Sequence, residues 1–172
     1  CEVKYNCPIQ NWPEEINITK KTIDVDLNLE TNFGPESIKN NIDSKPEFVW
    51  MTAESLGDND PALNYYSNLP AVFIFDKPLL NYLQLSTKRI IFLLDCLREL
   101  SNKRSTQVYL DNPIEYLKNK NFACTFAAVP KYKKITRVNI PTSEFPSVRL
   151  VKPINFYPSS YSSWKKRIEL NI

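Results

Sequence analysis

Short apolar runs of strand length alternate with segments of helical spacing from residue 47 onward. Turn-forming residues such as proline and aspartate bound most of these runs. An alternation of strands and helices predicts a parallel sheet with right-handed crossovers and helices on both faces. We therefore expect an α/β fold, a Rossmann-like three-layer sandwich with a mainly parallel sheet of about five strands. The expected strands are 48–51, 71–75, 106–110, 122–128 and 148–151.

The strongest helix signal runs from Ser86 to Leu100, where apolar residues recur at helical spacing behind a serine that can cap the first turn. Ile91 and Phe92 widen the apolar stripe, so we expect this helix to be well buried. Shorter helices are expected at 58–66, 113–117 and 164–170.

The first 46 residues differ in composition from the rest of the chain, being rich in asparagine, lysine, acidic residues and isoleucine. Apolar and polar residues alternate over 22–29, which predicts a half-buried strand that could pair at an edge of the sheet. The segment 35–42 has a proline at a plausible first helical position and predicts a short helix. We expect fraying before Trp12. The chain is therefore divided into a partly ordered N-terminal extension (1–46), an α/β domain (47–152) and a C-terminal tail with a short helix (153–172).

Composition is that of an ordinary soluble domain, with 172 residues, 42% hydrophobic and 24% charged. A formal net charge of +3 is too small to indicate a nucleic-acid surface, so nucleic-acid binding is expected to be weak or absent. The basic runs at 131–137 and 165–167 are interpreted as solvated faces, although an aromatic among lysines could also touch phosphate. No apolar run reaches the ~20 residues of a membrane span, so a cytoplasmic location is the default.

Candidate chemistry is sparse. The chain has no histidine, and its four cysteines lack metal-ligand spacing, so no metal site and no histidine-based catalytic set are expected. Cys96 and Cys124 are interpreted as small buried thiols, while Cys1 and Cys7 could pair or remain free. With only two glycines there is no phosphate loop, which argues against a standard dinucleotide or nucleoside-triphosphate enzyme.

Residues 50–63 join the first strand of the domain to its first helix and read WMTAESLGDNDPAL. This stretch resembles the opening signature of the DNA photolyase and cryptochrome family, in which a Trp-Phe-Arg-like run precedes Asp-Leu-Arg-Leu and Asp-Asn-Pro-Ala-Leu. This chain has one extra residue there, and it lacks the arginines of the family's first loop. Residues 92–100, 108–113 and 161–167 are similar to later motifs of the same family, in the same order.

The resemblance implies the family's N-terminal α/β domain, which carries an antenna chromophore, a folate or deazaflavin, near the carboxyl ends of its strands. Family enzymes bind FAD in a separate helical domain, so FAD is not expected in this chain, and neither is photolyase chemistry by this polypeptide alone. A separate FAD-binding photolyase-like protein is the implied partner. Carried over by position, the chromophore site would be lined by Met51, Thr52, Ala53, Glu54, Ser55, Phe75, Asp76, Pro130 and Tyr132.

Several of these residues have a structural alternative. Asp76 could bond a ligand hydroxyl or cap the segment that contains Pro78. Glu54 and Ser55 lie on the best-placed loop without a base to activate the serine. The acidic cluster at 58–60 is interpreted as helix capping by Asp58 or Asn59 rather than as a cation site.

Three functions remain open at this point. The first is a non-catalytic domain that binds a chromophore or nucleotide-like ligand and assists a flavin-domain protein. The second is a nucleotide-acting enzyme that uses Glu54, Asp76 or Asp111. The third is an interaction protein whose pocket has been lost.

Overall fold

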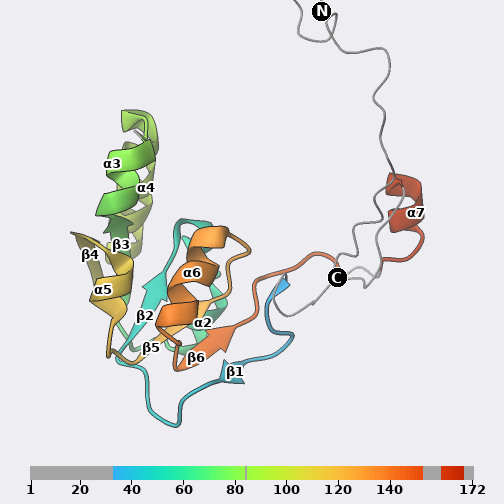
Figure 1. The fold of residues 1–172 in the computed structure, drawn as a ribbon, viewed down its shortest axis with the longest axis horizontal. Helices are drawn as coiled ribbons and strands as arrows, with labels where there is room; N and C mark the ends of the chain where they lie inside the picture. The colour runs from blue at the N-terminus through green and yellow to red at the C-terminus, as the bar shows by residue number, and fades with distance from the viewer. Residues whose placement is uncertain (1–32, 84, 153–159, 169–172) are drawn as a thin grey trace, which may run out of the picture.

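The computed structural model describes residues 33–83, 85–152 and 160–168. One six-stranded sheet, in the order β1-β6-β5-β2-β3-β4, organises the chain (Figure 1). Every neighbouring pair is parallel except β1 with β6. The α/β class and the mainly parallel sheet expected from the sequence are therefore confirmed. The strands are β1 (Lys39–Asn40), β2 (Phe48–Met51), β3 (Ala71–Asp76), β4 (Thr106–Asp111), β5 (Phe122–Thr125) and β6 (Ser143–Phe145).

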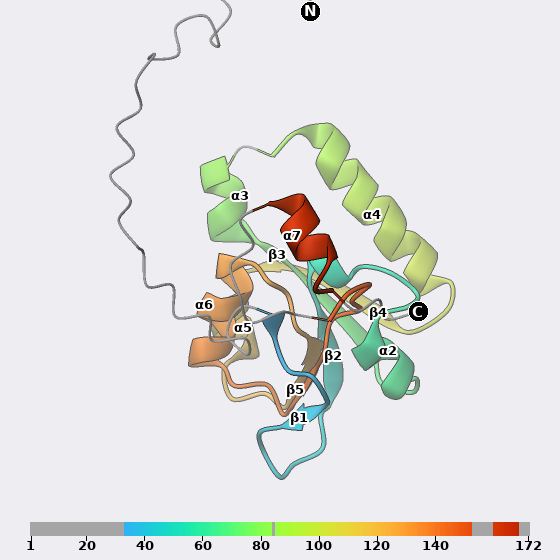
Figure 2. The same cartoon turned by 90° about the vertical axis from the view of Figure 1, so that its right-hand side faces the viewer.

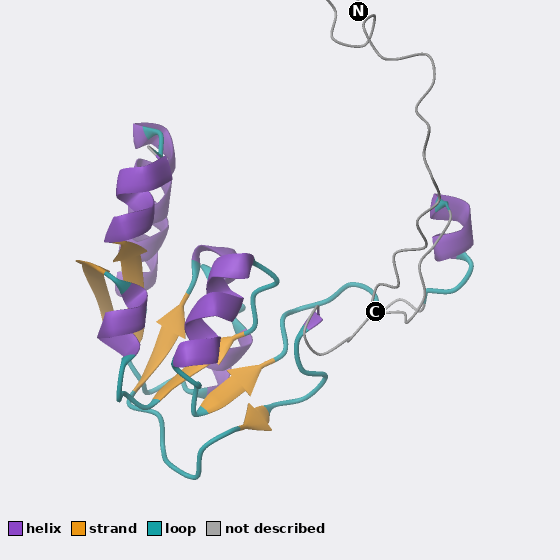
Figure 3. Cartoon of the chain, viewed as in Figure 1, coloured by secondary structure: helices purple, strands orange, loops and turns teal. Residues whose placement is uncertain are grey.

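Helices cover both faces of this sheet, as Figure 3 shows in purple against the orange strands. Side chains of α5 and α6 pack on one face, and side chains of α2 and α4 pack on the other. In Figure 1, α7 stands apart from the sheet. The helices are η1 (Ala53–Ser55), α2 (Pro61–Tyr65), α3 (Lys77–Leu83), α4 (Thr87–Ser101), α5 (Pro113–Leu117), α6 (Pro130–Val138) and α7 (Tyr161–Lys165).

The central strand β2 is buried at every position because both of its faces are covered. Successive side chains point to opposite faces of a sheet. Phe48 and Trp50 therefore join the core beneath α5 and α6, while Val49 and Met51 join the core beneath α2 and α4. The short apolar run that the sequence shows here is thus the place where the two cores meet.

The expected strand at 148–151 is wrong. Val148 and Leu150 are 75% and 80% exposed, and Arg149 between them donates hydrogen bonds to the backbone carbonyls of Gly34 and Pro35. Beyond β5, the sheet is extended instead by two short strands, with β6 beside β5 and β1 at the edge. β6 has only three residues and no apolar run, so periodicity does not reveal it.

The expected helix at 35–42 is also wrong, because this segment contains bends and then β1, which pairs antiparallel with β6. Gly34 precedes it with a φ of +77°, and a Cβ there would lie 2.2 Å from the ring of Phe126. A residue with a side chain would therefore meet both backbone strain and a clash. The strand expected at 22–29 and the fraying expected before Trp12 lie outside the described residues.

Helix α4 is less buried than the sequence indicates. Leu97 and Leu100 pack into the core, whereas Ile91 and Phe92 are 52% and 63% exposed, so the expectation of a well-buried helix is wrong. The helix lies along the outside of β3 and β4, as Figure 2 shows, and β4 is the last strand of the sheet. Only one stripe of α4 can therefore reach the core.

Candidate functional site

A pocket of about 170 Å³ lies at the carboxyl edge of the sheet, where β2 and β3 end. These strands are parallel neighbours, so the segments that leave them emerge side by side, which is where open α/β proteins bind ligands. Helices α3 and α4 supply one wall, and the start of α6 supplies another. The lining residues are Trp50, Met51, Thr52, Ala53, Glu54, Phe73, Ile74, Phe75, Asp76, Leu79, Leu80, Leu85, Arg89, Leu93, Pro113, Val129, Lys131, Tyr132 and Ile135.

Seven of the nine residues named from the sequence line this pocket, and Ser55 and Pro130 do not. The Ser55 hydroxyl accepts a hydrogen bond from the Thr52 backbone N–H at 3.2 Å, so it helps to fold the loop after β2. Pro130 is exposed at the first position of α6, where its missing N–H costs nothing. The seven lining residues are Met51, Thr52, Ala53, Glu54, Phe75, Asp76 and Tyr132.

Sequence reasoning named Tyr132 but missed the α3 residues and the other α6 residues that line the pocket. It interpreted the basic run at 131–137 as a solvated face and predicted no helix there, yet the segment forms α6. Tyr132, Ile135 and Asn139 are buried there at helical spacing, and a proline stands at the first helical position. That signal was present, but four basic residues between 131 and 137 obscured it.

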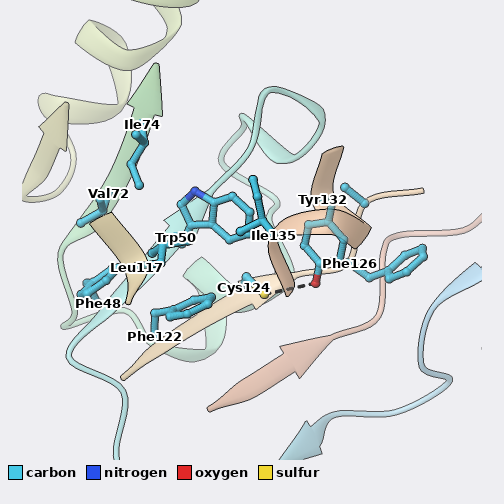
Figure 4. Close-up of a cluster of buried hydrophobic side chains, with 11 residues drawn as sticks. Phe48, Trp50, Val72, Ile74, Leu117, Phe122, Cys124, Phe126, Tyr132 and Ile135 are labelled. Atoms are coloured by element: carbon cyan, nitrogen blue, oxygen red, sulfur yellow. Dashed lines mark hydrogen bonds between the residues drawn. The ribbon is translucent and has the colours of Figure 1, made fainter. Parts of the chain in front are cut away.

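One wall of the pocket is a buried aromatic pair. The ring of Tyr132 stacks on the indole of Trp50, and Ile135 from the next turn of α6 belongs to the same cluster (Figure 4). The Tyr132 hydroxyl donates to Glu144 Oε1 at 2.7 Å and lies 3.2 Å from Cys124 Sγ. The tyrosine is therefore fixed by β5 and β6 as well as by its own helix.

Burial keeps the hydroxyl and the thiol of this cluster protonated and unreactive. Removal from water raises the pKa of the Tyr132 hydroxyl and of the Cys124 thiol far above their ordinary values. Both groups stay neutral near pH 7, and a neutral buried thiol is a poor nucleophile. The prediction of a small buried thiol is confirmed for Cys124 but not for Cys96, which is only partly buried.

Asp76 uses both carboxylate oxygens within the protein. Its Oδ1 accepts the backbone N–H of Leu79 at 2.9 Å, which caps the first turn of α3. Its Oδ2 lies 3.2 Å from Nζ of Lys131 on α6. The capping interpretation of Asp76 is thus confirmed, and the ion pair links the helices on two sides of the pocket mouth.

The acidic cluster before α2 also acts as a cap, but through a different residue from the two that were expected. Asp60 accepts the backbone N–H of Leu63 at 2.8 Å, while Asp58 pairs with Lys103 at the surface. Burial raises the pKa of the Asp60 carboxyl. In the part of the chain that the structure describes, no group of three His, Cys, Asp or Glu side chains could hold a metal ion.

Comparison with known proteins does not place the chain in a family. No protein-family model matches it. Neither the curated proteins nor the solved structures include one with significant similarity. The resemblance to photolyases and cryptochromes therefore rests on the sequence motifs alone and stays a hypothesis. None of the helices within the described ranges combines the length and apolar character that a bilayer crossing requires.

The remaining polar groups of the pocket stand near its rim. Glu54 and Arg89 are exposed, and neither forms an ion pair with any residue that the structure describes. The walls between them are mostly aliphatic and aromatic. Such a site can enclose the apolar body of a small molecule and leave one polar end near water.

Proposed function

We propose that this chain is a non-catalytic binding domain that holds a small, largely apolar ligand at the carboxyl edge of its sheet. The observation that carries this proposal is the pocket itself, built by β2, β3, α3, α4 and α6. Ligand sites are mostly apolar concavities with a few polar groups, and in open α/β sheets they occur at this edge. The stacked pair of Trp50 and Tyr132 offers a flat aromatic wall.

The pocket volume limits the size of the ligand. A dry cavity of about 150 Å³ accepts benzene, and sites for drug-sized molecules measure roughly 300 to 1,000 Å³. At about 170 Å³ this pocket suits a compound with a single ring. We therefore propose a single-ring ligand for the pocket in its present shape.

A second form of this proposal places a larger ligand, a folate or deazaflavin antenna, in the same pocket. Such a ligand needs a wider pocket, because the present volume falls below the range for molecules of that size. In that version the domain assists a separate FAD-binding, photolyase-like protein. An absorption band in the near ultraviolet or blue from the purified protein supports it, and a colourless protein that binds neither compound contradicts it.

The single-ring proposal is tested by calorimetric titration of the full chain with benzene-sized compounds. Ala53 is exposed and lines the pocket, so Ala53→Trp places an indole in its mouth. The matched control is Ala128→Trp, because Ala128 is also exposed but does not line the pocket. We expect saturable binding that Ala53→Trp abolishes and Ala128→Trp preserves. Absence of binding to the native chain, or equal effects of the two variants, contradicts the proposal.

A further inference from the structure

The charged groups around the pocket point to the polarity of its ligand. Resting on the function proposed above, we infer that the ligand is a single-ring carboxylate whose anionic group is held at the mouth by the guanidinium of Arg89. The ring lies against the apolar walls, and the carboxylate stays near water. This inference names the class of ligand, which pocket shape alone leaves open.

Two of the four charged side chains that line the pocket neutralise each other. Lys131 Nζ lies 3.2 Å from Asp76 Oδ2, and the other oxygen of Asp76 accepts the N–H of Leu79. A ligand that paired with either charge would have to break this contact. Recognition of charge therefore falls to Glu54 and Arg89, which have no ion-pair partner among the described residues.

The surroundings of Arg89 favour an anion over a cation. Arg89 lies in the first turn of α4, a helix of 15 residues with no acidic side chain in that turn. The Ser86 side chain makes no capping hydrogen bond, so the positive end of the helix dipole is not offset by a cap there. Lys88 adds a second positive charge to the same turn. These charges outweigh the single carboxylate of Glu54 near the rim.

The position of Arg89 on α4 also fits an amphipathic ligand. Leu85, which precedes the helix, and Leu93, one turn after Arg89, also line the pocket, and Leu93 is buried. A ring that packs against Leu93 thus leaves its substituent close to the exposed Arg89. A guanidinium can bind both oxygens of a ligand carboxylate at once. A neutral hydroxyl on the ligand offers only one oxygen and no charge.

Calorimetric titration of the full chain with three ring compounds tests the inference. Benzoate, benzyl alcohol and benzylamine present an anionic, a neutral and a cationic group on the same ring. We expect benzoate to bind about tenfold more tightly than benzyl alcohol, as an added charge-assisted hydrogen bond predicts. Arg89→Gln should remove this preference, so that benzoate and benzyl alcohol then bind with similar affinities.

The matched control is Lys88→Gln, which removes the same charge from the neighbouring residue, and Lys88 does not line the pocket. It should keep most of the preference for benzoate. The inference is overturned if benzoate and benzyl alcohol bind with equal affinity, or if benzylamine binds more tightly than benzoate. Either result leaves the proposed single-ring ligand standing. An equal loss of preference in both variants also overturns the inference. Absence of binding by all three compounds contradicts the proposed function, and the inference falls with it. Both variants change exposed helical positions, and circular dichroism checks that they fold.

Discussion

The ring of Tyr132 lies parallel to the indole of Trp50, with 5.8 Å between the ring centroids and 1° between the ring planes. This contact joins α6 to the central strand β2. The hydroxyl of the same tyrosine donates to Glu144 on β6 and lies within hydrogen-bond distance of the Cys124 thiol on β5. One side chain therefore connects three neighbouring strands and forms part of the pocket wall.

Removing the Tyr132 hydroxyl should destabilise the fold. Tyr132→Phe keeps the stacked ring but leaves Glu144 without its buried donor, so we expect a loss of about 1–3 kcal/mol in the free energy of unfolding. Urea denaturation measures this loss. The matched control is Tyr109→Phe, because the Tyr109 hydroxyl donates to Gln107 at the surface, and its removal should change little. Equal losses in the two variants contradict this account.

The buried thiol predicts a specific dependence of stability on pH. Burial raises the pKa of Cys124 above its ordinary value of 9.0, so the unfolded chain releases this proton first as the pH rises. The stabilisation is complete well below pH 9 and is lost as the pH rises above it. The slope contributed by one group approaches about 1.4 kcal/mol per pH unit.

Denaturation at several alkaline pH values checks this effect. The free energy of unfolding should fall more steeply for the native chain than for Cys124→Ala, which lacks the titrating thiol. Parallel curves for the two proteins would show that the thiol is not sheltered from water.

The cap of α2 offers a direct comparison between neighbouring residues. Asp60→Ala should cost about 1 kcal/mol because the N–H of Leu63 loses its acceptor. Asp60→Asn keeps an acceptor oxygen and removes a buried charge, so it should cost less. Asn59→Ala changes an exposed residue outside this cap and should be close to neutral. A larger loss from Asn59→Ala than from Asp60→Ala would restore the expectation drawn from the sequence.

The sequence located β2 and β3 because central strands of a parallel sheet are continuous apolar runs. It did not locate β6, because the three residues of this strand have no apolar run and are held in the sheet by pairing with β5 and β1. It also misplaced a strand over Val148 and Leu150, since apolar residues at the surface give the same signal as apolar residues in a core.

Helix α4 has leucines in the core and a leucine at the surface, and this difference gives a further prediction. Leu97 is 3% exposed and Leu94 is 46% exposed. Leu97→Ala should lower the free energy of unfolding by about 2–5 kcal/mol, whereas Leu94→Ala should change it by less than about 1 kcal/mol. Thermal denaturation of the two variants measures the difference. A large loss from Leu94→Ala would mean that another surface covers this side of the helix.

For the site, the sequence named the loop after β2 and the end of β3, because carboxyl ends of parallel strands gather at one edge. It did not find Arg89, because the apolar pattern around this residue predicted only a buried helix and gave no sign of a ligand site. It did not find Lys131 either, since the role of that lysine depends on the helix α6 that places it beside Asp76. Both residues owe their positions to tertiary packing that one sequence does not display.

The measurement that tests the central claim most directly is the indole N–H resonance of Trp50 in a nitrogen–proton correlation spectrum, recorded while benzyl alcohol is added. Trp50→Phe and Trp164→Phe assign the signals of the two tryptophans that the structure describes, of which Trp50 lines the pocket and Trp164 does not. We predict a saturable shift of the Trp50 signal, with the Trp164 signal unchanged. A Trp50 signal that does not move at saturating ligand, or that moves in parallel with the Trp164 signal, would contradict a ligand pocket at this edge of the sheet.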